Sequence, residues 1–438
     1  MIHHTPLVMI VTSDIAGQVR GKGFPATGLG EHLERGVGFT HTNHMINCWG
    51  TIPATPWGPL GDLVLMADPA TEVRVDFGDG TPDEWFMLGG LCTMDGRPWE
   101  CCLRHYLASA LESLRKETGL TLVAAFEHEF HDGGLAVRQG DSYSLDKVRR
   151  AGDFPGAVLH ALQAAGAEPE TFLPEFGQSQ FEFTVRPAPA MAAADRAIIA
   201  REMVRAAARR LGRDVSFSPQ VDPAGPGNGV HIHMSFRDRE GRPVSHDPSQ
   251  PFGLSGVTGS FVAGILKQLP AMVAVTAPSA ASYQRLKPHS WSSAFNNLGW
   301  RDREAAIRIC PGPETPGADV AEAFNVEFRA GDAAASPWLQ LGILVRAGLE
   351  GIRGGLATPE PVSSDPDAMS DGERRRHGVE RLPVSLGEAL DRLERAPDAG
   401  TLLPGELLEA YIMHKRGELE EVAGLAPEEI CRRYRDVY

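Results

Sequence analysis

Two histidines separated by a single residue follow a glycine-rich turn in the segment from Gly227 to Phe236. The neighbouring residues are apolar, which predicts a β-strand. Side chains alternate between the two faces of a strand, so His231 and His233 are expected to point into the same cavity. Two imidazoles on one face are typical of metal sites, including those of cupins, but structural histidines show the same spacing.

Five glutamates stand in segments that are otherwise rich in valine, alanine, phenylalanine and isoleucine. They are Glu127, Glu129, Glu175, Glu182 and Glu327. An unpaired carboxylate in an apolar interior is very costly, so these side chains are expected to gather and bind cations. Together with His231 they form a mostly oxygen donor set, which suits Mg²⁺ or Mn²⁺ better than Zn²⁺. Because like charges repel, we expect two or more divalent ions in one cavity.

Arginines interleave with these glutamates in the second half of the chain. They are Arg285, Arg301, Arg303, Arg308 and Arg329. The guanidinium group is the preferred partner of phosphate and carboxylate oxygens, although a single arginine is more often a surface residue. Several of them beside metal-type glutamates indicate a bound polyanion, namely a nucleoside triphosphate next to a carboxylate substrate. The sequence lacks a Gly-x-x-x-x-Gly-Lys-Ser/Thr motif, which excludes a P-loop.

The composition is that of a soluble enzyme. The chain has 438 residues, which allows two or three domains. Its 57 acidic and 42 basic residues give a formal charge of −15, which argues against nucleic acid or an anionic membrane as a partner. The six cysteines form no Cys-x-x-Cys pair, so a reducing cytoplasm is expected. The apolar run Leu7–Val11 is too short to span a membrane and predicts a first strand.

Glycine and proline break the first hundred residues into short apolar strands with few helices. The strands are expected at Leu7–Thr12, Asp62–Met66 and Glu84–Leu88. We place the domain boundary ahead of Arg104, which gives a small domain over residues 1–103 and a larger one over residues 104–438. The segment from Gly36 to Gly61 contains no Asp or Glu and is expected to be a packed surface loop, a lid or an interface segment.

The larger domain is expected to mix strands with helices. A strand over Leu120–Phe130 ends in the first glutamate pair. A helix is predicted to begin at a cap on Asp195 and to end near Leu211, where Gly212 follows. Pro359–Gly378 is expected to be an exposed loop. Further helices are predicted at Arg104–Thr118, Val257–Ala274, Pro337–Arg353, Leu386–Leu393, Pro404–Leu419 and Pro427–Tyr434.

Six segments, taken in this order, resemble the motifs of the glutamine synthetase family, and the resemblance runs the full length of the chain. The segments are Glu127–Glu129, Glu175–Glu182, Gly229–Ser235, Tyr283–Pro288, Arg301–Ile309 and Val326–Arg329. The resemblance implies an α+β fold, with a small β-grasp N-terminal domain and a larger catalytic domain of antiparallel strands flanked by helices. It also implies a homo-oligomer, commonly a dodecamer of two hexameric rings, with active sites between subunits.

The same resemblance implies roles for individual residues, with ATP and two to three Mg²⁺ or Mn²⁺ ions as cofactors. One ion would be held by Glu129, Glu175 and Glu182, and another by Glu127, His231 and Glu327. ATP would be bound by His233, Ser235, Arg303 and Arg308, and the residues acting in catalysis would be Arg303, Arg308 and Glu327. L-Glutamate would be bound by Arg285, Arg329 and Gly229.

Two departures from the family concern the nucleophile. Ammonia-using members carry a glutamate in a flap that follows an Arg-Leu-x-Pro turn, whereas Trp291 stands at that position within His289–Ser293. These members also carry an aspartate in the region that matches Gly36–Gly61, which has no carboxylate here. An uncharged aromatic surface suits the apolar part of an amine larger than ammonia, and places Trp291 in the amine site.

The motifs and the departures together predict a γ-glutamylamide ligase that uses an alkyl or aryl amine. The γ-carboxylate of glutamate would take a phosphoryl group from ATP, and a small amine would then displace phosphate. Three alternatives stay open on the sequence. They are an ammonia-using glutamine synthetase with a rearranged flap, a non-catalytic scaffold of glutamine synthetase type, and a metal-dependent cupin.

Overall fold

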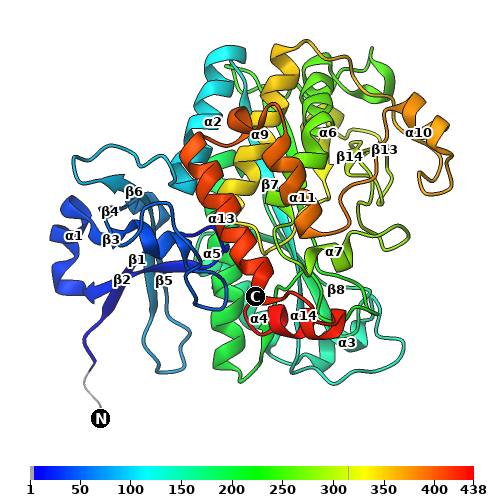
Figure 1. Ribbon diagram of the computed structural model, residues 1–438. Coiled ribbons are helices and arrows are strands. Elements are labelled where there is room, and N and C mark those ends of the chain that lie inside the picture. The colour runs from blue at the N-terminus through cyan, green and yellow to red at the C-terminus, as the bar shows by residue number, and fades with distance from the viewer. Residues whose placement is uncertain (1–3, 314) are drawn as a thin grey trace.

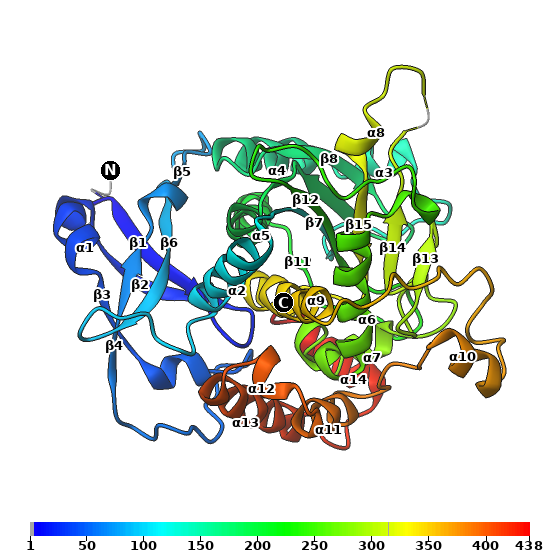
Figure 2. The ribbon, with the colours of Figure 1, turned by 90° about the horizontal axis from the view of Figure 1, so that it is seen from above.

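The computed structural model describes residues 4–313 and 315–438 of the chain. A small sheet at the N-terminus lies beside a larger sheet that is covered by helices (Figures 1 and 2). The predicted α+β fold is confirmed.

The N-terminal sheet has the strand order β2-β1-β6-β4-β3, with β5 paired to β6. The strands are β1 (Leu7–Ser13), β2 (Val19–Pro25), β3 (Val37–Thr40), β4 (Asp62–Ala67), β5 (Val73–Val75) and β6 (Glu84–Thr93). β1 runs parallel to β6, and the other pairs are antiparallel. The three strands predicted in this region are therefore confirmed, and one short helix, α1 (Leu29–Arg35), accompanies them.

The acid-free segment 36–61 joins the two domains. Trp57 donates its indole N–H to Glu406, at 2.5 Å, and the Asn47 amide donates to Glu421, at 2.7 Å. Both acceptors belong to α13 (Gly405–Glu421). Among the three roles that the sequence left open, the described contacts support an interface segment within the chain.

The larger sheet has the strand order β13-β14-β15-β12-β7-β9-β8, and β10 and β11 also pair with β7. The strands are β7 (Thr121–Asp132), β8 (Pro169–Pro174), β9 (Gln180–Val185), β10 (Ala188–Pro189), β11 (Val215–Ser216), β12 (Val230–Arg237), β13 (Leu298–Trp300), β14 (Ile307–Cys310) and β15 (Asn325–Phe328). The expectation of an antiparallel sheet is correct except at its edge, where β13 and β14 are parallel.

Long helices cover the inner face of this sheet, and Figure 2 shows α2, α5 and α9 between the two sheets. The helices after α1 are α2 (Leu103–Thr118), α3 (Leu145–Arg150), α4 (Phe154–Ala164), α5 (Ala190–Arg210), α6 (Gly256–Thr276), α7 (Ser282–Arg285), α8 (Val320–Ala323), α9 (Pro337–Arg353), α10 (Asp371–His377), α11 (Leu386–Arg395), α12 (Ala399–Leu402), α13 and α14 (Pro427–Arg435). All six helices that were predicted as residue ranges, from Arg104–Thr118 to Pro427–Tyr434, are present. Within the described ranges, α6 is long and apolar enough to cross a membrane, but 78% of its most apolar window is buried inside the molecule.

Two predictions about helices were wrong. α5 begins at Ala190 rather than at Asp195, because the alanine-rich residues ahead of Asp195 themselves favour a helix. Asp195 is buried in α5, where it pairs with Arg104 at 2.8 Å and accepts the indole N–H of Trp338 at 2.7 Å. The segment expected to be an exposed loop contains α10, which Ser370 starts with a capping box.

Candidate active site

Strand register brings the predicted charged residues to one face of the large sheet. On β7, the side chains of Phe126, His128 and Phe130 are buried towards the helices, so Glu127 and Glu129 point the other way. His128 lies against Phe183 with ring centroids 5.3 Å apart, and burial lowers its pKa to about 3. His128 is therefore a neutral packing residue between two functional carboxylates.

The neighbouring strands supply the partners of these glutamates at matching positions. Glu127 lies opposite His231 on β12, and Glu129 lies opposite Glu182 on β9. On the other side of β12, Glu327 of β15 lies opposite His233, and Arg308 of β14 lies opposite Glu327. We call this set of facing residues the carboxylate–histidine ladder, and its members are Glu127, Glu129, Glu182, His231, His233, Arg308 and Glu327.

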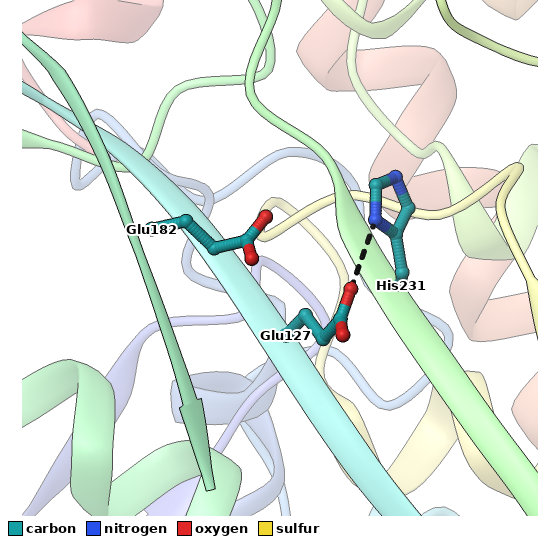
Figure 3. A group of neighbouring side chains, drawn as sticks. All are labelled: Glu127, Glu182 and His231. Carbon is teal, nitrogen blue, oxygen red and sulfur yellow. Dashed lines mark ion pairs between the residues drawn. The ribbon is translucent and has the colours of Figure 1, made fainter. Parts of the chain in front are cut away.

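Two groups within the ladder have the geometry of metal sites. Glu127, Glu182 and His231 place one donor atom each within 4.8 Å of one another, and Glu127, His233 and Glu327 do the same. Figure 3 shows the first group, in which Nδ1 of His231 lies 3.5 Å from Oε2 of Glu127. In the second group, Nε2 of His233 lies 3.1 Å from Oε1 of Glu127. Glu127 thus faces both candidate ion positions.

Glu129 and Glu175 stand beside these two groups rather than in them. Glu129 accepts the backbone N–H of Gly229, at 2.8 Å, and the Gln180 amide, at 3.3 Å. Glu175, in the loop between β8 and β9, accepts the Tyr143 hydroxyl, at 3.0 Å. The grouping of donor atoms therefore differs from the division into two triads that the family resemblance implies, although all six residues line one region.

Burial and mutual repulsion shift the pKa values of the clustered glutamates in different directions. Burial, together with the nearby Glu127, Glu129 and Glu175, raises the pKa of Glu182 to about 10. Burial also raises the pKa of Glu129 to about 7. Burial opposes the ionisation of Glu127 as well, but the adjacent His233 and His231 hold its pKa well below the usual value. Such a site fits divalent cations, which would take the place of the protons on Glu182 and Glu129.

This charge pattern predicts that stabilisation by divalent ions grows with pH. The raised pKa of Glu182 stabilises the ion-free fold below the unfolded value of 4.5, and this contribution is lost as the pH rises towards about 10. Added Mg²⁺ or Mn²⁺ should therefore raise the melting temperature more at about pH 8.5 than at about pH 6. Scanning fluorimetry of the wild type and of Glu182→Gln checks this, and an ion effect that is equally pH-dependent in the variant contradicts it.

Three of the predicted arginines lie beside the ladder. Arg308 places Nε 2.6 Å from Oε2 of Glu327, and Arg329 contacts the other oxygen of Glu327. Arg329 also donates to the carbonyl of Arg303, at 3.0 Å. Arg285 is buried and donates to the carbonyl of Gly331, at 2.7 Å. Arg301 and Arg303 lie on an exposed loop, and Ser235 stands two positions after His233, on the same face of β12.

The glycines ahead of the two histidines make room for Arg285. A Cβ on Gly227 would lie 2.4 Å from Cγ of Arg285, and a Cβ on Gly229 would lie 2.9 Å from Nε2 of His231 and 3.3 Å from an Arg285 nitrogen. A larger residue at Gly227 or Gly229 would therefore clash with Arg285 or His231.

Gly227→Ala is expected to weaken glutamate binding by displacing Arg285. An overpacked site costs about 1–3 kcal/mol, so we expect the KM for glutamate to rise by a factor of about 5 to 150. Gly30→Ala, in α1, where a Cβ meets open space, is the control for a glycine outside the site. Steady-state kinetics with glutamate as the varied substrate decides, and an unchanged KM contradicts the role of Arg285.

Glu304 and Arg329 hold the loop around Trp291 in place. Trp291 is 68% exposed and has a φ of 53°, and its carbonyl accepts from Arg329 at 3.3 Å. Both oxygens of Glu304 accept backbone N–H groups of the loop, from His289 at 3.0 Å and from Trp291 at 3.1 Å. Asp365 and Asp367 each lie 3.6 Å from the His289 imidazole. The expectation of an uncharged surface around Trp291 is therefore wrong, because three carboxylates lie beside the loop. The residues next to Trp291 in the sequence did not reveal them, since they come from other segments of the chain.

The sequence analysis missed four residues that touch the ladder or Glu175. Gln180 donates to Glu129, Tyr143 to Glu175, and the carboxamide oxygen of Asn325 lies 2.7 Å from Nδ1 of His233. The fourth is Cys310, whose Sγ lies 3.7 Å from Glu327. Alternation along β14 and β9 could have found Cys310 and Gln180, since each stands two positions from a predicted ligand. No local pattern marks Tyr143.

Two family descriptions together match the chain from residue 1 to residue 434. Residues 1–99 match the glutamine synthetase N-terminal domain, and residues 100–434 match the glutamine synthetase catalytic domain.

Individual proteins give the same result. The chain is 32% identical to the gamma-glutamylpolyamine synthetase of Streptomyces coelicolor, over 98% of this chain and 93% of that protein. It is 30% identical to the glutamine synthetase of Pyrococcus abyssi, over 94% and 90% of the two chains. A solved structure described as a novel glutamine synthase homolog superimposes with a TM-score of 0.92 at 41% identity, covering 100% of both chains. A GmaS/ADP complex shares the fold, with a TM-score of 0.81 at 23% identity over 99% and 97% of the chains.

Proposed function

Since the chain belongs to the glutamine synthetase family and is a ligase that forms carbon–nitrogen bonds, we propose that it joins the γ-carboxylate of L-glutamate to an organic amine with the use of ATP. The products would be a γ-glutamylamide, ADP and phosphate. Family membership removes the cupin alternative, which rested on the two histidines alone.

The ladder fits the divalent ions that such a reaction needs. The side chains that would hold them are Glu127, Glu129, Glu175, Glu182, His231 and Glu327, with His233 beside them. These residues offer oxygen and imidazole donors, and Nε2 of His233 is buried without a hydrogen-bond partner. When bound, the ions would neutralise negative charge on the transferring phosphoryl group.

The arginines have separate tasks in the proposed reaction. Arg285 and Arg329 would orient glutamate, while Arg308 and Arg303 would hold the ATP phosphates. The γ-carboxylate oxygen attacks the terminal phosphorus of ATP, so that ADP leaves and γ-glutamyl phosphate forms. The amine nitrogen then attacks the acyl carbon, phosphate leaves, and the nitrogen releases one proton. Guanidinium groups already in place need little rearrangement to stabilise charge on the phosphoryl group.

The observation that carries the choice of an organic amine is the loop at Trp291. A large exposed aromatic ring stands where the ammonia-using members that the sequence resembles have a glutamate. The nearest carboxylate, Glu304, is occupied by two backbone N–H groups and holds the loop in place. An indole ring would bury the hydrocarbon part of an amine or stack over its ammonium group.

Specific contacts also favour two other nucleophiles. Glu304 stands next to Trp291, which keeps ammonia as a candidate. Asp365 and Asp367 beside His289 would attract a second ammonium group, and the relative from Streptomyces coelicolor is called a gamma-glutamylpolyamine synthetase. The deciding experiment measures ADP release and product mass with glutamate, ATP and a panel of ammonia, a short alkylamine, an arylamine and a polyamine.

Two outcomes of the panel would overturn the proposal. Product with ammonia alone would replace the organic amine by ammonia. ATP binding without turnover of any amine would indicate a non-catalytic scaffold and contradict the proposal.

Trp291→Ala is expected to act on the amine step. Loss of one apolar contact in a specificity pocket costs about tenfold to 200-fold in kcat/KM, and we expect that loss for the organic amine. Glutamate-dependent ADP release without amine should change less. Phe252→Ala removes another exposed aromatic ring, 46% exposed, and serves as the control. Equal losses in both measurements would contradict a role for Trp291 in binding the amine.

We also propose a cytoplasmic homo-oligomer, a ring assembly in which neighbouring subunits complete each active site. Exposed apolar side chains next to Glu175 support a contact with a second copy. They are Tyr143, Leu145 and Phe176, with exposed fractions of 61%, 62% and 59%. Sedimentation analysis of the full chain tests the assembly, and a monomer at catalytic concentrations with full activity would contradict it.

A further inference from the structure

A buried lysine lies against the loop that carries Glu175. Lys147 belongs to the first turn of α3, which lies beside β8 (Figures 1 and 2), and its side chain is 0% exposed. Its ammonium group donates to the carbonyl of Glu175, at 2.8 Å, and to the carbonyl of Gly177, at 2.6 Å. One cation therefore holds the main chain on both sides of Phe176.

The segment 142–147 holds the same loop at two further points. Ser142 donates its hydroxyl to the carbonyl of Phe176, at 2.9 Å, and Tyr143 donates its hydroxyl to Oε2 of Glu175, at 3.0 Å. Three consecutive carbonyls of the loop and the carboxylate of Glu175 thus accept hydrogen bonds from this segment. Oε2 of Glu175 also accepts the N–H of Phe176, at 2.9 Å, so the position of this side chain depends on the position of its backbone.

Helix α3 is itself tied to the large sheet. Arg213 donates to the carbonyl of Ala151, the residue that follows α3, at 2.7 Å. Arg213 also pairs with Asp132, which is buried at the end of β7. The loop with Glu175 is thereby held to the large sheet by way of Lys147.

The chemistry of the ammonium group suits this task. It carries three N–H donors on one atom, so it can donate to two carbonyls at once. Its nitrogen also lies 5.3 Å from the ring centroid of Phe181, and burial lowers its pKa to about 8, which leaves it charged at neutral pH. A buried charge is costly unless it is hydrogen-bonded, so the ammonium group and the two carbonyls stabilise each other.

We propose that Lys147 is a positioning residue, which sets the affinity of the site for divalent ions by holding Glu175 where it can reach them. The inference rests on the proposed function, in which Glu175 is an ion ligand. Without the ammonium group, the carbonyls of Glu175 and Gly177 would lose a buried donor, and the loop would turn them towards water. The carboxylate of Glu175 would move with its backbone. Residues that orient a metal ligand contribute about 10–100-fold to metal affinity.

Lys147→Met removes the donors and keeps most of the volume of the side chain. Binding of Mn²⁺ to the full chain is followed by the magnetic resonance signal of the free ion, and we expect the variant to bind about 10–100-fold more weakly. The Mn²⁺ concentration for half-maximal ADP release should rise by a similar factor, while the rate at saturating Mn²⁺ largely recovers. Lys116→Met, which alters an exposed lysine of α2, is the matched control.

A double variant tests whether Lys147 acts through Glu175. Glu175→Gln alone should weaken Mn²⁺ binding, and adding Lys147→Met should weaken it little further, because both changes disturb one ligand. Losses that simply add would indicate a general structural role and overturn the inference, and so would wild-type affinity in a folded Lys147→Met protein. Thermal melts establish folding. If Lys147→Met does not fold, Ser142→Ala decides, since it removes an exposed donor to the same loop, and unchanged Mn²⁺ binding in that variant would overturn the inference.

The outcomes separate this inference from the ligase proposal. Wild-type affinity in Glu175→Gln would remove both the ion role of Glu175 and the positioning role of Lys147. Weaker Mn²⁺ binding in Lys147→Met would stand even if the wild type turned over no amine. ADP release and product mass are measured separately on the wild type, so either proposal can fail while the other stands.

Discussion

Glu327→Gln is expected to abolish most synthesis and to lower stability at the same time. Glu327 is 1% exposed and lies between Arg308, Arg329 and His231. Loss of its charge leaves two guanidinium groups without their shared partner, and breaking a buried pair costs about 3–5 kcal/mol. It also removes a ligand from the second group, and because changes beyond the direct ligands already cost about 10–100-fold in metal affinity, we expect activity to fall by at least 10²-fold.

Two measurements separate the parts of this effect. Thermal melts report the lost pairing, and ADP release at saturating Mg²⁺ reports the lost ligand. Glu322→Gln is the control, because Glu322 precedes the same strand but is about half exposed and pairs with Arg237 at the surface. Near-normal turnover by a folded Glu327→Gln protein would show that the ladder is not the catalytic site.

Arg308→Lys is expected to slow phosphoryl transfer strongly while leaving glutamate binding almost unchanged. Lysine keeps the charge but loses the planar fork that can contact Glu327 and a phosphate at once. Arginines that contact a transferring phosphoryl group contribute about 10³–10⁵-fold to kcat, so we expect a loss near the lower end of that range. Single-turnover ADP formation with glutamate and ATP measures it.

The control for Arg308 is an arginine in the turn after β12, outside the ladder. Arg242→Lys alters a side chain that is 72% exposed and paired with Asp238, and should leave the rate unchanged. If Arg308→Lys raised the KM for glutamate and left the single-turnover rate intact, Arg308 would belong to the glutamate site instead.

The sequence predicted the charged residues of the site because alternation along a strand is local. Glu127 and Glu129 stand two positions apart on one strand, so they share a face. The same holds for His231 and His233. Which strands become neighbours is not local information. The grouping of Glu127 with both His231 and His233 depends on β12 lying between β7 and β15, and this order cannot be derived from spacing.

Contacts between distant segments account for two features that the sequence analysis did not find. Asp195 looks like a helix cap, but it is a buried partner of Arg104 inside α5. The surface around Trp291 seemed uncharged because Glu304, Asp365 and Asp367 reach it from other segments. Contacts between distant segments produce no periodic pattern in the sequence, and so these side chains could be found only in the structure.

The arrangement of the ladder also determines when the protein can first hold its ions during folding. Its members come from strands that are widely separated along the chain, and these strands must align before members of different strands meet. Pairing between distant segments is the slow part of folding, because loop closure must precede the contacts that reward it. Ions that bind the ladder would therefore act late in folding, on a sheet that has already formed.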